Sequence, residues 1–128
     1  GKSDQALQFY NEGLTLYKSA LGDDDLEVAN CYQQIGGVYM KLNDHELAVS
    51  CYVESIRIIR LKKGLDNLQV AQALYNLGRV YAKSAEYEKA LACFEECLRI
   101  RRQELGETHL DVLAVHRYID ALQRKRRR

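Results

Sequence analysis

The chain has 128 residues, enough for one domain, and 47% of them are apolar, which excludes a disordered chain. Its formal net charge at pH 7 is only +1, so positive charge is not abundant overall. No apolar run approaches the roughly 20 residues that span a bilayer, and the opening residues GKSDQALQFY lack the apolar region of a signal peptide.

The first predicted element is an amphipathic helix at 4–20. Its apolar face carries Ala6, Tyr10 and Leu14, which are spaced as on one side of a helix. Gly22 ends the helix by supplying the left-handed backbone conformation that follows many helices. We interpret this element as the second helix of a hairpin whose first helix is missing.

Two complete helical hairpins follow, and a single helix then forms the first half of another hairpin. Each of these helices carries apolar residues at a helical spacing along one face. The predicted helices lie at 26–41, 44–61, 68–83, 87–104 and 110–125.

Polar side chains precede the first helix of each hairpin. Asp25, Asn67 and His109 stand at the N-cap position, where a side chain accepts a hydrogen bond from a free backbone N–H. At the turn inside the first hairpin, Asn43 tolerates the positive φ that such a turn often needs. These residues predict where the helices begin and turn.

The hairpins repeat with a period of 42 residues, without a gap. A fixed period of paired helices is typical of an α-solenoid, in which each repeat buries its apolar face against its neighbours. In the second hairpin, Gly78 allows the partner helix to approach closely at Ala90. The recurring residues are Tyr32, Ile35, Gly36, Tyr39, Ala48, Tyr52 and Ile56, and then Leu74, Leu77, Gly78, Tyr81, Ala90, Phe94 and Leu98.

This pattern of large, small and aromatic residues resembles the tetratricopeptide repeat, and its long period resembles the kinesin light chain type. The resemblance implies an all-α solenoid of about six antiparallel helices and a cytoplasmic scaffold or adaptor that binds proteins. Ala85 stands where the family usually has a glycine, at the turn of the second hairpin. We expect a single domain, 1–128, made of a half repeat 1–22, repeats 23–64 and 65–106, and a half repeat 107–128.

The resemblance also implies a concave groove formed by the first helices of the hairpins. In the family, an asparagine before the large–small pair often holds the backbone of a bound peptide; Asn76 matches it, whereas Gln34 replaces it. Tyr75 is expected on the side of its helix that does not face its hairpin partner. With the core positions set aside, the predicted groove residues are Asn30, Gln33, Gln34, Gly37, Lys41, Gln72, Tyr75, Asn76, Arg79, Lys83, Arg117 and Arg124.

The charged groove residues are all cationic, and Lys125 adds another cation beside Arg124. Such a groove would attract acidic, carboxylate-bearing or phosphorylated peptides. The alternative is that these polar residues are only a solvated surface. The sequence therefore predicts a protein or peptide partner that is acidic, or else a structural spacer with no ligand of its own.

No catalytic arrangement of residues is recognisable, and we expect neither an enzyme nor a cofactor. The four cysteines, Cys31, Cys51, Cys93 and Cys97, lie inside helical patterns and are interpreted as reduced, structural thiols of an intracellular protein, with no metal site. His116 occupies a packing position, and His45 lies at a turn.

The basic end at 124–128 admits three interpretations. It is a helix C-terminus rich in cations, a nuclear-localisation signal, or a contact with nucleic acid or an acidic surface. Nucleic acid is disfavoured because no aromatic residues are interleaved nearby and no basic stripe runs through the other helices. The ends of the array are expected to leave apolar residues uncovered, which would favour end-to-end self-association.

Overall fold

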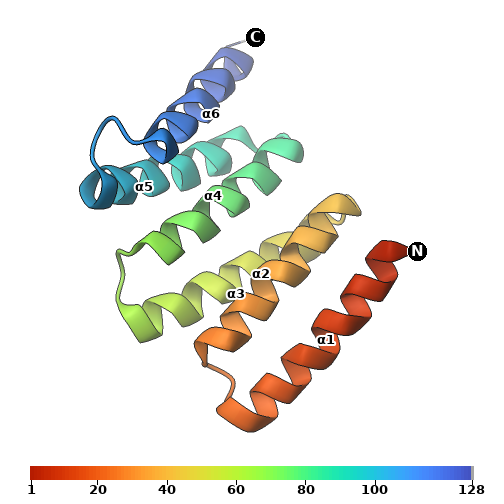
Figure 1. The fold of residues 1–128 in the computed structure, drawn as a ribbon. Coiled ribbons are helices and arrows are strands. Elements are labelled where there is room, and N and C mark those ends of the chain that lie inside the picture. The colour runs from red at the N-terminus through yellow and green to blue at the C-terminus, as the bar shows by residue number, and fades with distance from the viewer. Residues whose placement is uncertain (128) are drawn as a thin grey trace. The chain divides into compact units, whose positions relative to one another are not determined.

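A computed structural model describes residues 1–127 of the protein, and all of their regular structure is helical (Figure 1). The helices match the predicted ones, with ends that differ by at most about two residues. They are α1 (Lys2–Leu21), α2 (Leu26–Lys41), α3 (His45–Lys63), α4 (Leu68–Lys83), α5 (Tyr87–Leu105) and α6 (Leu110–Arg126).

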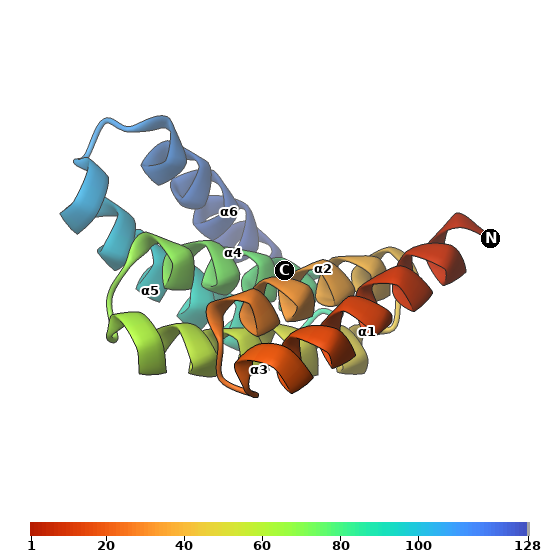
Figure 2. The same cartoon turned by 60° about the horizontal axis from the view of Figure 1, so that its bottom comes forward.

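The helices divide into two compact units, which are described separately. The N-terminal unit, Gly1–Leu65, holds α1, α2 and α3, and the C-terminal unit, Asp66–Arg128, holds α4, α5 and α6. In the N-terminal unit α2 packs against both α1 and α3, and in the C-terminal unit α5 packs against both α4 and α6 (Figures 1 and 2). Each unit thus contains one complete hairpin and one additional helix.

The predicted N-caps are confirmed. Each cap side chain accepts a hydrogen bond from a backbone N–H in the first turn, which satisfies a group that the helix itself leaves unpaired. The caps and the residues that donate to them are Asp25 with Glu27 (2.9 Å), Asn67 with Val70 (3.0 Å) and His109, through Nδ1, with Asp111 (3.0 Å).

The glycines that end α1, α3 and α5 adopt positive φ, as expected for Gly22, but not the left-handed helical conformation. Their φ values are 95°, 94° and 89°, while ψ lies at 162°, 175° and 161°. This extended region at positive φ is essentially restricted to glycine, because a Cβ atom clashes there. The prediction was therefore right about the residue type and wrong about ψ.

The turns inside the two hairpins share one conformation although their residues differ. Asn43 and Ala85 both have φ of 61°. Asparagine tolerates this left-handed backbone conformation, whereas alanine adopts it at a cost of roughly 1–2 kcal/mol. The geometry expected for Asn43 is confirmed, and Ala85 is held in the same geometry in spite of its Cβ atom.

Glycines allow the paired helices to approach closely, as predicted, but the nearest group opposite Gly78 is the ring of Phe94 and not the expected Ala90. A Cβ atom added to Gly78 would lie 2.9 Å from a ring carbon of Phe94 on α5. In the N-terminal hairpin, a Cβ atom on Gly36 would lie 3.1 Å from the ring of Tyr52 on α3. In each hairpin, therefore, an aromatic ring rests directly on the backbone of the partner helix.

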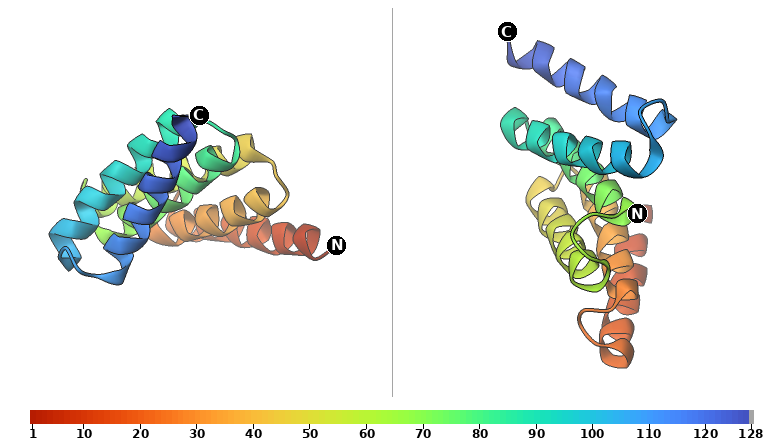
Figure 3. Two further views of the ribbon diagram at one scale, coloured as in Figure 1. Left: turned by 90° about the horizontal axis from the view of Figure 1, so that it is seen from above. Right: turned by 90° about the vertical axis from the view of Figure 1, so that its left-hand side faces the viewer.

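The extra helices of the two units differ in how well their apolar residues are covered. We expected part of the apolar face of α6 to be exposed, but Val112, Val115, Ile119 and Leu122 are all buried, because α6 lies alongside α5 (Figure 3). By contrast, α1 has no buried residue, and its Phe9 and Leu16 are 71% and 68% exposed. The apolar surface expected at the chain ends thus occurs on α1.

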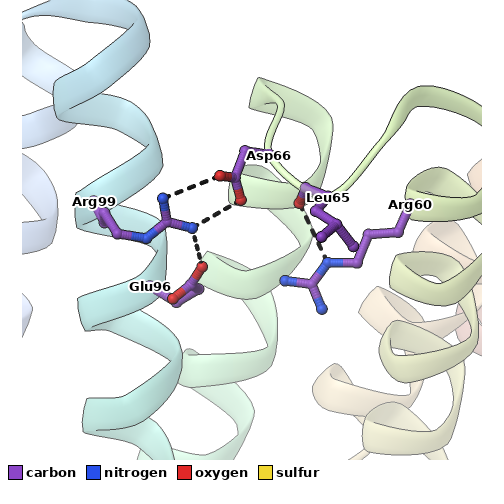
Figure 4. Close-up of polar contacts among 5 residues, drawn as sticks. All are labelled: Arg60, Leu65, Asp66, Glu96 and Arg99. Atoms are coloured by element: carbon purple, nitrogen blue, oxygen red, sulfur yellow. Dashed lines mark hydrogen bonds and ion pairs between the residues drawn. The ribbon is translucent and has the colours of Figure 1, made fainter.

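An arginine on the second helix of each hairpin holds the loop that opens that hairpin. In the C-terminal unit, Arg99 binds both oxygens of Asp66, at 3.1 and 2.8 Å, and also pairs with Glu96 (Figure 4). The equivalent Arg57 pairs with Asp24 at 2.8 Å. These exposed ion pairs fix the geometry of the loops more than they add stability.

None of the helices in the part of the chain that the structure describes is long and apolar enough to cross a membrane.

Candidate functional site

A cationic pocket lies between α4 and α6 of the C-terminal unit. Its volume is about 270 Å³, and three of its lining residues, Arg79, Lys83 and Lys125, carry positive charge. Among the described residues that line it, none is acidic. The remaining lining residues are Ala82, Tyr118, Ala121 and Leu122. The pocket therefore combines an apolar wall with cations that could pair with a carboxylate or a phosphate.

An aromatic cluster lies next to this pocket. The ring of Tyr118 stacks on Phe94 at 5.1 Å and meets Tyr75 edge-on at 5.4 Å. Tyr75 also meets Phe94 edge-on at 5.8 Å. The expectation that Tyr75 points away from its hairpin partner was therefore wrong: its ring contacts the hairpin partner α5 as well as α6. Burial is the main cause that raises the pKa of Tyr75, and the neighbouring Tyr118 adds to it.

Arg101 contacts Tyr75 of this cluster and is the one charged residue among the buried residues of the described chain. Only 6% of its surface is exposed. The guanidinium carbon lies 4.8 Å from the centroid of the Tyr75 ring, a cation–π distance. Its nitrogens donate to the backbone oxygen of Asp111 at 3.2 Å and to Oε1 of Gln72 at 3.0 Å. Arg101 thus connects α4, α5 and α6.

The sequence patterns did not indicate a role for Arg101. The available signal was the repeat itself, because the equivalent residue, 42 positions earlier, is the buried Ile59. An arginine in place of a core isoleucine marks a position where the two hairpins differ in chemistry. A buried charge needs hydrogen-bond partners, and these come from neighbouring helices that the sequence alone does not place.

The predicted groove residues of α4 lie along one side of the helix. Gln72 is exposed, and its Nε2 donates to Oδ1 of Asn76 at 3.4 Å. Arg79 lies 6.0 Å from the centroid of the Tyr75 ring, and Lys83 is exposed at the last turn. The structure therefore pairs Gln72 with Asn76 and places Arg79 near Tyr75, while Lys83 lies further along α4 and shares the cationic pocket with Arg79.

The corresponding face of the N-terminal unit is less charged. Asn30 and Gln34 line a pocket of about 230 Å³ with the aromatic residues of α1. Gln33 and Gly37 are half-buried, and Lys41 is exposed at the end of α2. A cation on α1, Lys18, lies 5.4 Å from the centroid of the Tyr32 ring, and a hydrogen bond to Tyr32 is the main cause that raises its pKa.

The two arginines predicted on α6 do not line the cationic pocket. Arg117 is exposed, and Arg124 lines a separate pocket with Asp120, Gln123 and Arg127. Lys125 takes part in the cationic pocket instead. One step along a helix rotates a side chain by about 100°, which is enough to move it to another face.

The basic end of the chain is partly engaged within the C-terminal unit. Arg126 pairs with Glu88 of α5 at 2.9 Å, while Arg127 is exposed. Arg128 lies outside the described residues. At least one cation of the predicted basic stretch thus links α5 and α6 through an exposed ion pair.

The cysteines have the environment of structural thiols. Burial raises the pKa of Cys51, Cys93 and Cys97 to about 11, so these thiols are protonated at neutral pH. All four cysteines are free. No group of three or more His, Cys, Asp or Glu residues within 1–127 is arranged to hold a metal ion.

Comparisons with known proteins agree with this architecture. The family model of the tetratricopeptide repeat matches residues 1–61, 33–103 and 69–119. No curated protein matches the sequence.

Two solved structures have a similar fold. BtubC (BKLC) from P. vanneervenii is 24% identical, with a TM-score of 0.87 over 97% of this chain and 50% of that one. A Podosopora anserina putative kinesin light chain with nearly identical TPR-like repeats is 14% identical, with a TM-score of 0.84 over 95% of this chain and 58% of that one. This chain therefore spans about half the length of these proteins, and the likeness shows an all-α solenoid fold.

Proposed function

Because the chain belongs to the tetratricopeptide repeat family, whose fold is typically a non-enzymatic scaffold for protein–protein interaction, we propose that it binds an extended acidic peptide. The C-terminal unit provides the main binding surface, in the manner of an intracellular adaptor of the kinesin light chain type. The predicted groove residues of the N-terminal unit extend this proposal with amide side chains and a single lysine.

One observation carries the proposal: the pocket between α4 and α6 presents Arg79, Lys83 and Lys125 without an acidic neighbour in its wall. The net charge of the chain is only +1, so this cluster is a local concentration of charge. Like charges that converge on an apolar pocket repel one another until an anion binds. An acidic side chain of a peptide supplies that anion, and its backbone offers hydrogen-bond partners to Asn76.

A fluorescence-anisotropy titration tests this function. The probes are a set of fluorescein-labelled peptides of ten residues. In each peptide, glutamate alternates with one other amino acid, which differs from peptide to peptide. In a matched set, glutamine replaces every glutamate. We expect binding of some glutamate peptides and an affinity that falls as salt rises, because exposed charges are screened. Equal binding of the glutamine peptides would contradict the acidic class of ligand.

Two variants locate the surface. Arg79→Glu should weaken binding strongly at low salt and less at high salt. Asn76→Ala should remove a hydrogen bond worth about 0.5–1.5 kcal/mol, a loss of about 2–10-fold in affinity. Lys62→Glu is the matched control, because it makes the same change of charge at an exposed position of α3. Binding lost equally in the control would mean that net charge, and not this surface, attracts the peptide.

The basic end supports a second candidate, contact with nucleic acid or an acidic surface. Arg127 and its exposed neighbours would supply the charge. Titration with labelled single-stranded and duplex oligonucleotides over the same salt series separates the two functions. Replacement of Arg126 and Arg127 by glutamine should abolish binding to oligonucleotides and leave binding of the acidic peptide intact. A protein that binds neither class of probe would be a structural spacer.

A further inference from the structure

We propose that Arg101 is a positioning residue that fixes Asn76 as a hydrogen-bond donor toward the ligand, through Gln72. The inference rests on the proposed function, since it concerns the same peptide-binding surface. It assigns the group that this part of the surface recognises: an acceptor oxygen, such as a peptide carbonyl or a carboxylate.

Arg101 sets which groups donate and which accept in the series of hydrogen bonds from Arg101 through Gln72 to Asn76. A guanidinium group has N–H donors and no acceptor, so the group of Gln72 that lies 3.0 Å away must be the amide oxygen. The two ends of an amide side chain are otherwise hard to tell apart. Here the chemistry of the neighbour decides the orientation, and it places the NH₂ group of Gln72 on the other side.

The same reasoning applies one turn further along α4. Nε2 of Gln72 can only donate, so the group of Asn76 at 3.4 Å is its oxygen, Oδ1. The NH₂ group of Asn76 is left over, and none of the described residues accepts a hydrogen bond from it. Asn76 therefore offers both of its N–H donors to a ligand, while its oxygen already accepts a hydrogen bond from Gln72.

Arg101 is well suited to fix the orientation of the Gln72 amide because its own side chain is held in place. It is 6% exposed, it is stacked 4.8 Å from the centroid of the Tyr75 ring, and it is anchored to the backbone oxygen of Asp111 at 3.2 Å. Its charge is permanent at any physiological pH. None of the described carboxylates pairs with it, so the oxygen of Gln72 remains a required partner.

The N-terminal unit provides an internal comparison. At the positions equivalent to Arg101, Gln72 and Asn76, it has Ile59, Asn30 and Gln34. Isoleucine cannot donate a hydrogen bond, so nothing equivalent orients the two amides. The two units should therefore differ: the amide of the C-terminal unit is fixed as a donor, while that of the N-terminal unit can rotate to suit its ligand.

The donor and acceptor roles of Gln72 and Asn76 are tested first. The experiment uses the ¹⁵N-labelled protein without peptide, so the result does not depend on a ligand. We expect the side-chain NH₂ protons of Gln72 to exchange with water more slowly than those of Asn76, since only the former are bonded within the protein. In Arg101→Ile this difference should disappear. Slower exchange at Asn76 than at Gln72 in the unmodified protein would overturn the proposal.

The effect on binding is tested with the strongest glutamate peptide and a double-mutant cycle. Gln72→Met removes the amide that connects Arg101 to Asn76, without any change of charge. Asn76→Ala removes the amide that is proposed to donate to the ligand. Each should lower affinity by about 2–10-fold, and the double variant should lose no more than the larger single effect. The melting temperature of Gln72→Met should fall, because the buried Arg101 loses a hydrogen-bond partner, so binding is measured at a temperature at which every variant is folded. Asn30→Met, at the equivalent position of the N-terminal unit, is the control and should have no such coupling.

The outcomes separate this inference from the proposed function. If Asn76→Ala weakens binding and the two losses multiply in the double variant, the peptide surface is correct and the positioning role of Arg101 is wrong. If Asn76→Ala binds every peptide as the unmodified protein does, the proposed function itself fails at this surface, and the exchange experiment still decides the order of the hydrogen bonds.

Discussion

Replacement of Gly78 by alanine tests how tightly the C-terminal hairpin is packed. The new Cβ atom would lie 2.9, 3.0 and 3.1 Å from three atoms of the Phe94 ring. Ordinary carbon–carbon contacts are about 3.5–4.0 Å, so the ring must move by roughly half an ångström or more. Phe94 cannot move easily, because it is fully buried and stacks on Tyr118.

The expected magnitude is the difference between two opposing effects. Overpacking typically costs about 1–3 kcal/mol, while alanine in place of glycine gains up to about 1 kcal/mol of helix propensity. We therefore expect Gly78→Ala to lower the free energy of unfolding by up to about 2 kcal/mol. Gly13→Ala should do the opposite and gain up to about 1 kcal/mol, because nothing lies within 4 Å of its Cβ position on α1.

Chemical denaturation, followed by circular dichroism, measures both variants, and Phe94→Leu provides the second arm. A smaller side chain at position 94 leaves room for the new methyl group, so Gly78→Ala should cost less in the Phe94→Leu background than in the unmodified protein. The reasoning would be refuted if Gly78→Ala stabilised the protein as much as Gly13→Ala does, or if its cost were the same in both backgrounds.

Four further predictions concern other parts of the molecule. Ala85→Gly should stabilise the protein by about 1 kcal/mol in thermal unfolding, because glycine adopts the positive φ of this turn without strain. As a control, Ala92→Gly at an exposed position inside α5 should destabilise the protein by a similar amount. Ser55→Ala should be neutral or stabilising in the same assay, because the buried hydroxyl has no hydrogen-bond partner in the described chain; a loss above about 1 kcal/mol would contradict this. Burial raises the pKa of Cys93 to about 11, so alkylation of this thiol by iodoacetamide should be slow at pH 8 and should accelerate as the pH rises toward that value. A chelator should leave the melting temperature of the protein unchanged. The exposed Phe9 on α1 should promote self-association, which light scattering would detect as a mass that rises with concentration and that Phe9→Lys keeps at the monomer; a strict monomer at high concentration would contradict this.

The sequence alone determined the helices, their starts and their repetition, because these depend on local chemistry. Asp25 can cap a helix wherever that helix packs, and the glycine at position 64 is required by the conformation of its own backbone. The close approach of paired helices was also predictable from the repeated small residues at Gly36 and Gly78, whereas the structure was needed to show that the group opposite Gly78 is Phe94 and not Ala90. The period of 42 residues made each of these inferences stronger by repeating it.

Only the tertiary structure decided which polar side chains act together. Arg101 is 29 residues from Gln72 in the sequence, and its role exists only because α4, α5 and α6 meet around it. The repeat places Lys125 at the position equivalent to Lys83, but only the structure shows that Lys125 lines the cationic pocket and that the adjacent Arg124 lines another. Hydrogen bonds are directional and short, so a site built from them is defined by atomic positions that the spacing of residues cannot supply.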